Sequence, residues 1–231
     1  MPGRGMSVHT DKAYEAELRA LRERLLAMGG LVEQAIASSV RAIIERDSAL
    51  AEQVKVRDRD INRMEVEIDG MCRRVLALRQ PAASDLRFIT TALKIVVDLE
   101  RMGDLAVNVA ERALDLNQAP PLGPLHELAK IADLAEAQLK KALDAFVTGD
   151  VDKAEEVMRG DDLIDALYLK IFNDMLALMM EDSRSIRRAT AMMFAGKHLE
   201  RFGDHATNLA EMVVYMVRGQ DVRHPKSRAQ E

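Results

Sequence analysis

Glu100, Asp104 and Asn108 are spaced by four residues and carry side chains suited to bind a metal ion. In a helix this spacing places them within about 80° of one another, on one face. Carboxylate and amide oxygens are hard ligands, which suit Mg²⁺, Mn²⁺ or iron better than metals that prefer thiolates. Two acids one turn apart repel each other modestly, and a cation between them removes that repulsion. The spacing therefore predicts an oxygen-lined metal site.

A second copy of this pattern, Glu200, Asp204 and Asn208, follows one hundred residues later. The surrounding segments, LERMGDLAVNVAE (99–111) and LERFGDHATNLAE (199–211), are identical at nine of thirteen positions. This identity is too high for coincidence, so the chain contains an internal repeat. Each half is predicted to hold one metal site.

Two further polar pairs follow the same repeat. Asp58 and Asn62 correspond to Asp161 and Asp165 at an offset of 103 residues. Each pair has the i, i+4 spacing of one helix face, so each is placed to supply further oxygens from a neighbouring helix. The predicted site of each half then holds one ion or several.

Gly103 and Gly203 stand inside the two repeated segments, where each costs its helix roughly 1 kcal/mol relative to alanine. A glycine at the same place twice indicates that another backbone approaches closely there. Arg101 and Arg201 are expected either to brace the acids of their own helix or to pair with acids on other helices. An acidic helix face is more often merely solvated, and the paired glycines are what favours a bound metal or another functional ligand.

The composition indicates an all-α protein. Aromatic residues make up 3% of the 231 residues and tryptophan is absent, whereas Ala, Leu, Met, Glu and Arg are abundant. The net charge of -5 does not attract phosphate backbones, which argues against nucleic acid as a partner. Cys72 is the single cysteine, so no internal disulfide forms. A signal-peptide pattern and an uncharged apolar run of roughly 20 residues are both missing, which predicts a cytoplasmic protein.

The helix punctuation predicts six long helices in two tandem three-helix bundles related by pseudo-twofold symmetry. Thr10, Ser48 and Asp150 are suitable amino-terminal caps, and Gly149 suits a left-handed carboxyl cap. The fifth helix is expected to run without a break from Asp150 to Met180. The predicted organisation is a disordered amino-terminal tail (1–9), a first three-helix repeat (10–117), a Pro- and Gly-rich linker (118–124), a second three-helix repeat (125–218) and a carboxyl-terminal tail (219–231).

Two alternatives from other classes stay open. A carboxylate-bridged oxidase or storage protein of the helical-bundle type uses Glu-x-x-His pairs, and no Glu in this chain has a His three residues later. His198 and His205 fall on the opposite side of the predicted helix from Glu200, so they are expected to be packing or interface residues. A purely structural helical adaptor without metal is the second alternative.

The repeated acid-xxx-Asp-xxx-Asn motif, the segment RQPAASDLR (79–87) and the segment QDVRH (220–224) resemble the PhoU family over residues 10–224. The resemblance implies a cytoplasmic negative regulator of phosphate uptake and of the phosphate-starvation response. Such a regulator connects the ATPase of a phosphate ABC transporter to a phosphate sensor histidine kinase. The resemblance also implies a homodimer that associates with the membrane only peripherally, through those partners. Metal ions (iron, Zn, Mn or Mg) are implied to bind through the acidic motif, and no catalytic residue is implied.

Overall fold

The structure is a computed structural model that describes residues 5–122 and 125–219. Helices account for most of these residues, and no strand occurs among them. In chain order the elements are α1 (Gly5–Ile44), α2 (Ser48–Leu78), α3 (Ala83–Asn117), α4 (His126–Thr148), α5 (Val151–Arg159), α6 (Asp161–Glu181), the 3-10 turn η1 (Ser183–Ser185) and α7 (Ile186–Arg218). The prediction of an all-α protein is confirmed.

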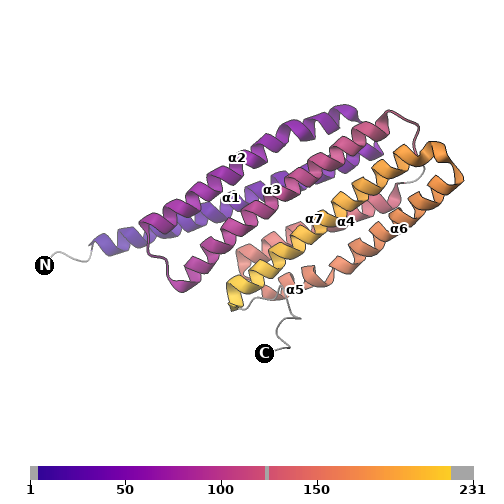
Figure 1. Ribbon diagram of the computed structural model, residues 1–231. Coiled ribbons are helices and arrows are strands. Elements are labelled where there is room, and N and C mark those ends of the chain that lie inside the picture. Colours follow the sequence, from indigo (N-terminus) through magenta and orange to yellow (C-terminus); the bar gives the residue numbers. More distant parts are fainter. Residues whose placement is uncertain (1–4, 123–124, 220–231) are drawn as a thin grey trace.

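Two elongated three-helix units lie side by side (Figure 1). Helices α1, α2 and α3 form the first unit, and α4, α5 with α6, and α7 form the second. Along the seam α3 and α7 run in opposite directions and contact each other extensively, and α1 also contacts α4. The two tandem bundles therefore have the predicted pseudo-twofold relation, with α3 and α7 closest to the axis.

A continuous apolar core joins the two units. Leu99 of α3 and Phe202 of α7 are fully buried within it. Phe88 of α3 stacks on Phe146 of α4, with the ring centroids 5.3 Å apart. Because aromatic and aliphatic side chains of one unit pack against those of the other, the acidic motifs of the two halves are held in one framework.

The helix caps follow the internal repeat. Asp47 Oδ1 accepts a 2.9 Å hydrogen bond from the backbone N–H of Leu50, and Asp150 Oδ1 accepts a 3.1 Å bond from Lys153. Asp47 therefore caps α2, and the predicted cap Ser48 is instead the first helical residue. An aspartate at this position satisfies an otherwise free backbone donor of the first turn. Gly149 ends α4 with φ 67, as predicted for a left-handed cap.

Two helix boundaries differ from the prediction. Helix α1 begins at Gly5 instead of Thr10, and residues 5–10 contain no proline that would stop a helix there. Residues 1–4 and 220–231 of the predicted tails, with the segment QDVRH, lie outside the described residues. The fifth predicted helix is divided at Gly160 into α5 and α6. A Cβ at Gly160 would lie 3.1 Å from Nε2 of Gln138 on α4, so this amide occupies the space beside the break.

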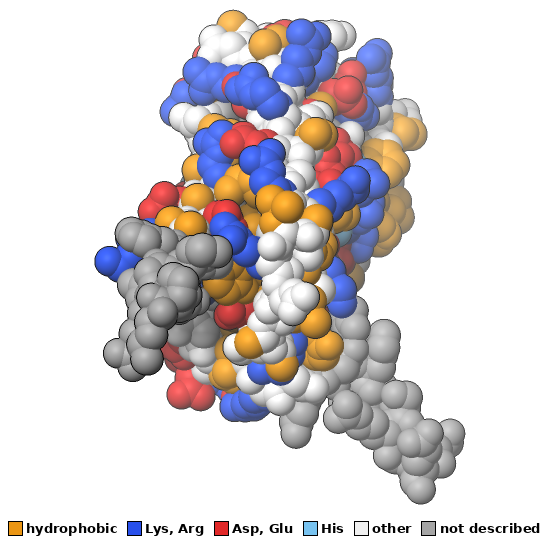
Figure 2. Space-filling view, turned by 90° about the vertical axis from the view of Figure 1, so that its left-hand side faces the viewer, with side chains coloured by type: hydrophobic (Ala, Val, Ile, Leu, Met, Phe, Trp, Pro, Cys, Tyr) orange, Lys and Arg blue, Asp and Glu red, His pale blue; other side chains and the backbone are white. Residues whose placement is uncertain are grey.

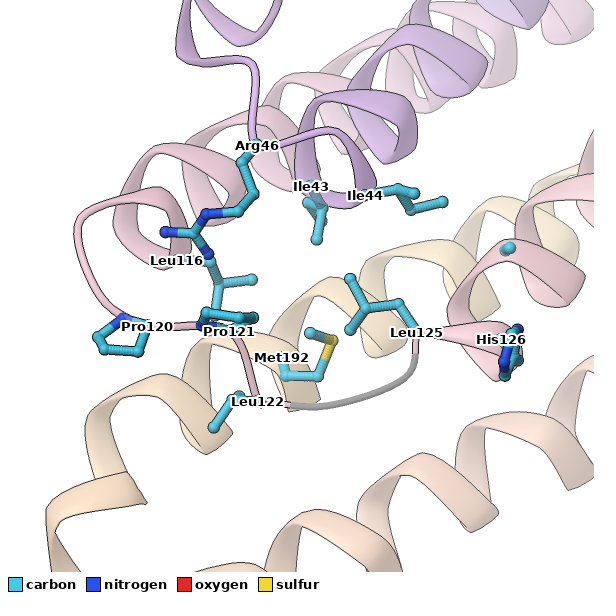
Figure 3. A pocket seen from close by; sticks show the side chains of 11 residues that line it. Ile43, Ile44, Arg46, Leu116, Pro120, Pro121, Leu122, Leu125, His126 and Met192 are labelled. Carbon is cyan, nitrogen blue, oxygen red and sulfur yellow. The ribbon is translucent and has the colours of Figure 1, made fainter.

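The linker packs against the turn between α1 and α2. Arg46 in this turn has φ 57, which is unusual for a residue with a side chain. Its guanidinium donates to the carbonyl oxygens of Asn117 (2.8 Å) and Ala119 (2.5 Å), and these bonds hold the strained turn in place. Beside them lies an apolar cavity of about 300 Å³, lined among others by Leu116 and Met192 (Figure 3).

The end of the molecule that carries the α2–α3 connection has a mixed surface. Figure 2 shows Lys and Arg side chains there, interspersed with acidic and hydrophobic ones. Arg79 donates to both carboxylate oxygens of Glu17, at 3.1 and 2.8 Å. Arg87 Nε donates a 3.0 Å hydrogen bond to the carbonyl of Met216 on α7. The segment RQPAASDLR thus contacts α1 through Arg79 and the second unit through Arg87.

Within residues 5–122 and 125–219, no helix has both the length and the apolar character of a membrane span.

Candidate metal site

The first acidic cluster consists of Asp58 on α2 with Glu100 and Asp104 on α3. A Cβ built on Gly103 would lie only 3.1 Å from Asp58 Oδ1. The absent side chain therefore lets α2 approach α3 closely, which is what the repeated glycine indicated. Asn62 donates a 2.8 Å hydrogen bond to Asp58 Oδ2, whereas Asp58 Oδ1 is buried without a hydrogen-bond partner.

The carboxylates of the first acidic cluster repel one another in a partly desolvated setting. Burial raises the pKa of Asp58, the hydrogen bond from Asn62 opposes this, and the charge of Asp104 raises the pKa further. Burial also raises the pKa of Glu100, with Asp104 as the next cause. Arg101 Nη1 donates to Asp104 Oδ2 at 3.2 Å, and its Nε lies 3.5 Å from Glu100 Oε2. Arg101 therefore braces the acids of its own helix, one of the two roles expected for it.

The second acidic cluster consists of Asp161 and Asp165 on α6 with Glu200 and Asp204 on α7. A Cβ at Gly203 would lie 2.8 Å from Cδ1 of Ile164, so α6 approaches α7 as α2 approaches α3. Asp161 Oδ1 and Glu200 Oε2 are buried without hydrogen-bond partners. The repeat in the sequence thus places equivalent acids together in both halves.

Charge repulsion also acts in the second acidic cluster. Burial raises the pKa of Asp161, and the adjacent Asp165 raises it further. Partial desolvation raises the pKa of Asp204, followed by the charge of Asp161. Lys197 Nζ donates a 2.5 Å hydrogen bond to Glu200 Oε1 and compensates that carboxylate in part. The carboxylates of each cluster therefore outnumber the basic side chains that form ion pairs with them.

Three predicted site residues lie at the margin of the clusters. Asn108 and Asn208 are half-buried, one turn beyond the acids of their helices. Arg201 is exposed, and the described side chains include no ion-pair partner for it. The role that Arg101 has in the first half is taken in the second by Lys197 instead.

The carboxylate oxygens of both clusters suit a cation that prefers oxygen ligands, although the side chains do not yet converge on a common point. Buried carboxylate oxygens without partners are present in each cluster, and such orphaned acceptors are satisfied by an ion or a water. Among the described side chains, however, no group of three or more His, Cys, Asp or Glu is already arranged to hold a metal ion. A cation therefore requires side-chain rotations that turn the acids toward a common point.

Gln138 on α4 is a feature of the second half that the sequence-based reasoning missed. Its side chain is 8% exposed, and neither Oε1 nor Nε2 has a hydrogen-bond partner. The amide lies between two glycines: a Cβ on Gly160 would be 3.1 Å from Nε2, and one on Gly203 would be 3.5 Å from Oε1. Each glycine immediately precedes an acid of the second acidic cluster. The internal repeat contained a signal for this feature: at the offset of 103 residues, Gln138 replaces the small apolar Ala35 of the first half.

The two central histidines of α7 lie at the seam between the units. His205 Nδ1 is 2.6 Å from Asp98 Oδ1 of α3, and both side chains are largely buried. The ring of His198 packs against Phe194, with centroids 6.5 Å apart. The prediction that these histidines are packing or interface residues is confirmed.

Fold and site together define a class: an all-α protein of two pseudosymmetric three-helix units, each with an acidic motif at a close helix crossing. The model of the PhoU domain family matches residues 25–113 and 128–213. These ranges fall within the two predicted repeats, and each contains one acidic motif. This chain belongs to the PhoU family.

Relatives match over nearly the whole chain. The chain is 47% identical over 218 residues to a Pseudomonas putida protein described as a phosphate-specific transport system accessory protein PhoU homolog, covering 94% of this chain and 85% of the relative. The corresponding protein of Escherichia coli (strain K12) is 37% identical over 226 residues, covering 97% and 93%. The crystal structure of PhoU from Pseudomonas aeruginosa superposes with a TM-score of 0.86 at 45% identity, covering 90% of this chain and 100% of that one. Nothing in these matches supports an oxidase or storage protein.

Proposed function

We propose that this protein is a cytoplasmic negative regulator of phosphate uptake and of the phosphate-starvation response. In this role it links the ATPase of the phosphate ABC transporter to the phosphate sensor histidine kinase, and it performs no catalysis itself. It acts as a homodimer and reaches the membrane only through these two partners. The observation that carries the proposal is the near full-length match to proteins named as accessory proteins of the phosphate-specific transport system.

A deletion strain tests the regulatory role. We expect alkaline phosphatase, as a reporter of the starvation response, to stay active in phosphate-rich medium when the protein is absent. A plasmid copy of the wild-type chain should restore repression. Normal repression in the deletion strain would contradict the proposal.

Capture of the tagged protein from phosphate-replete cells tests the partners. The transporter ATPase and the sensor kinase should both be recovered, and recovery of neither after crosslinking would contradict the linking role. A tagged and an untagged copy expressed together should also copurify if the protein forms homodimers.

The second part of the proposal is that each acidic cluster binds a divalent or iron-type cation, namely iron, Zn, Mn or Mg. Asp58, Glu100 and Asp104 would hold it in the first half, with oxygens from Asn62 and Asn108. Asp161, Asp165, Glu200 and Asp204 would hold it in the second, with Asn208 nearby. The orphaned buried oxygens and the raised carboxyl pKa values support this assignment. A bound cation would neutralise the carboxylates and fasten α2 to α3 and α6 to α7.

A further inference from the structure

A cleft of about 410 Å³ lies between the end of α3 and the beginning of α7, outside both acidic clusters. We call it the arginine cleft. Its lining combines three guanidinium groups with one carboxylate, a hydroxyl group and an aromatic ring, from Arg112, Asp115, Arg187, Arg188, Thr190 and Phe194.

The arginine cleft carries more positive than negative charge. Arg112 is compensated, because its Nη1 lies 3.1 Å from Asp115 Oδ2 and its Nη2 lies 3.5 Å from Glu111 Oε2. Arg188 Nη1 donates a 2.9 Å hydrogen bond to a carbonyl of the linker, which orients the guanidinium and leaves its charge in place. Arg187 is exposed, and no carboxylate pairs with it among the described side chains. Two arginines thus face the cleft without a carboxylate of the lining to balance them.

An exposed aromatic ring forms one wall of the arginine cleft. Phe194 is 51% exposed, which is unusual for so large an apolar side chain. The ring of His198 stacks beside it at an interplanar angle of 25°. The wall is therefore an exposed aromatic ring next to guanidinium groups that no carboxylate of the lining neutralises.

The pseudo-twofold axis provides an internal comparison. At the offset of 100 residues, Arg87 corresponds to Arg187 and Lys94 to Phe194. Arg87 Nε donates a hydrogen bond to the carbonyl oxygen of Met216 on α7, and Lys94 Nζ lies 5.6 Å from the ring centroid of Tyr215. The equivalent place in the first half is therefore filled by the protein's own side chains. At the corresponding place of the second half, Arg187 pairs with no carboxylate among the described side chains, and the ring of Phe194 stays 51% exposed.

We propose that the arginine cleft binds a nucleotide. The planar guanidinium groups of Arg187 and Arg188 match the paired oxygens of a phosphate chain. The ring of Phe194 offers a stacking surface for the base, and the hydroxyl of Thr190 adds a hydrogen bond. This binding site is distinct from the two acidic clusters proposed as metal sites, because it uses none of their residues.

Calorimetric titration of the full chain tests this assignment. ATP is titrated at low salt in the presence of EDTA, so that no cation in the acidic clusters contributes. We expect saturable binding at one site per chain. Arg187→Glu should weaken it about tenfold or more, because it removes one phosphate contact and adds a repelling charge. Phe194→Ala should weaken ATP binding and leave the binding of tripolyphosphate unchanged.

Arg63→Glu is the matched control, since Arg63 is similarly exposed on α2 and far along the chain from the cleft. It should bind ATP like the wild type, and circular dichroism should show that each variant is folded. If ATP binds the Arg187→Glu variant as tightly as the wild type, or does not bind the wild type at all, the cleft is not the site. If tripolyphosphate binds as tightly as ATP, the ligand is a polyphosphate and the nucleotide assignment is overturned. If adenosine binds as tightly as ATP, the phosphate contacts are wrong.

Discussion

Asp58 of α2 lies against Gly103 of α3: a Cβ at the glycine would be 3.1 Å from Oδ1 of the aspartate. The same contact also brings Cδ1 of Ile61 to 3.1 Å. The glycine is therefore a condition for the close crossing of α2 and α3, and the crossing places a carboxylate of α2 beside those of α3. Gly203 has the corresponding position over Ile164 in the second half.

Gly103→Leu and Gly203→Leu should each lower the free energy of unfolding by on the order of 1–3 kcal/mol, because the added side chain overpacks the crossing. Gly70→Leu is the control, since a Cβ at Gly70 meets nothing within 4 Å. That variant should be unchanged or stabilised through its better helix propensity. Urea unfolding measures all three, and equal stability of the Gly103 and Gly70 variants would refute the close crossing.

Gln138→Leu should raise the free energy of unfolding by about 1–3 kcal/mol in metal-free protein, because it removes a buried amide without partners. The replacement has a similar size and is apolar. Gln53→Leu on the exposed face of α2 is the control and should change stability by about 0.5 kcal/mol at most. A loss of stability in Gln138→Leu would mean that the amide is satisfied, for example by a buried water.

The sequence predicted the helix faces on which the repeated acids lie more accurately than it predicted the boundaries of α5 and α6. Acids at the same offsets in both halves had to lie on equivalent faces, and the structure does bring Asp58 to α3 and Asp161 to α7. The break at Gly160 was missed, because an isolated glycine inside an apolar pattern is usually tolerated. The side-chain amide of Gln138 on α4 lies beside the break, 3.1 Å from where a Cβ on Gly160 would be. Helical periodicity within α5 and α6 contains no information about a side chain on α4.

The arrangement of the acids around an ion was also beyond the sequence. Spacing fixes the face on which Glu100 and Asp104 lie, and it does not fix their rotamers. In the first half Arg101 donates to Asp104, whereas in the second half Lys197 donates to Glu200. The acids are thus held by different neighbours, although the two motifs are nearly identical. Side-chain orientation depends on such neighbours from within and outside the motif.

In metal-free protein, the stability contribution of Asp161 should fall as the pH rises. Its pKa in the folded state is raised above the ordinary 3.8 by burial and by Asp165. Such a group binds its proton more tightly when folded, so its contribution is lost as pH rises from 3.8 through the folded-state pKa. Asp161→Asn should therefore gain more stability relative to wild type at pH 7 than at pH 4, as measured by urea unfolding in EDTA.

Glu127→Gln provides a control of opposite sign. The hydrogen bond from Lys170 lowers the pKa of Glu127 below its ordinary value of 4.5. Its contribution is present above that value and is lost as the pH falls. The variant should therefore lose more stability relative to wild type at pH 7 than at pH 4. If both variants changed in the same direction, the proposed electrostatics of the second acidic cluster would be wrong.

A cation in the acidic clusters should stabilise the fold. A ligand that binds only folded protein at a hundredfold excess over its Kd adds roughly 2.7 kcal/mol. Chelation should therefore lower the melting temperature, and Mn²⁺, Fe²⁺ or Mg²⁺ should restore it. Asp104→Asn and Asp204→Asn should be no less stable than wild type without metal, since each relieves repulsion, and should gain less when metal is added. Equal gains in wild type and variants would place the bound ion elsewhere.

Metal content tests the central claim most directly. Elemental analysis of protein purified without chelator should find a transition metal or Mg²⁺ in the wild type at about one ion per cluster or more. The double variant Asp104→Asn/Asp204→Asn should lose most of it, whereas Asp60→Asn, on α2 and outside the clusters, should retain it. A double variant with the full metal content of the wild type, or a wild type without metal after incubation with each candidate ion, would contradict the assignment of the acidic clusters as metal sites.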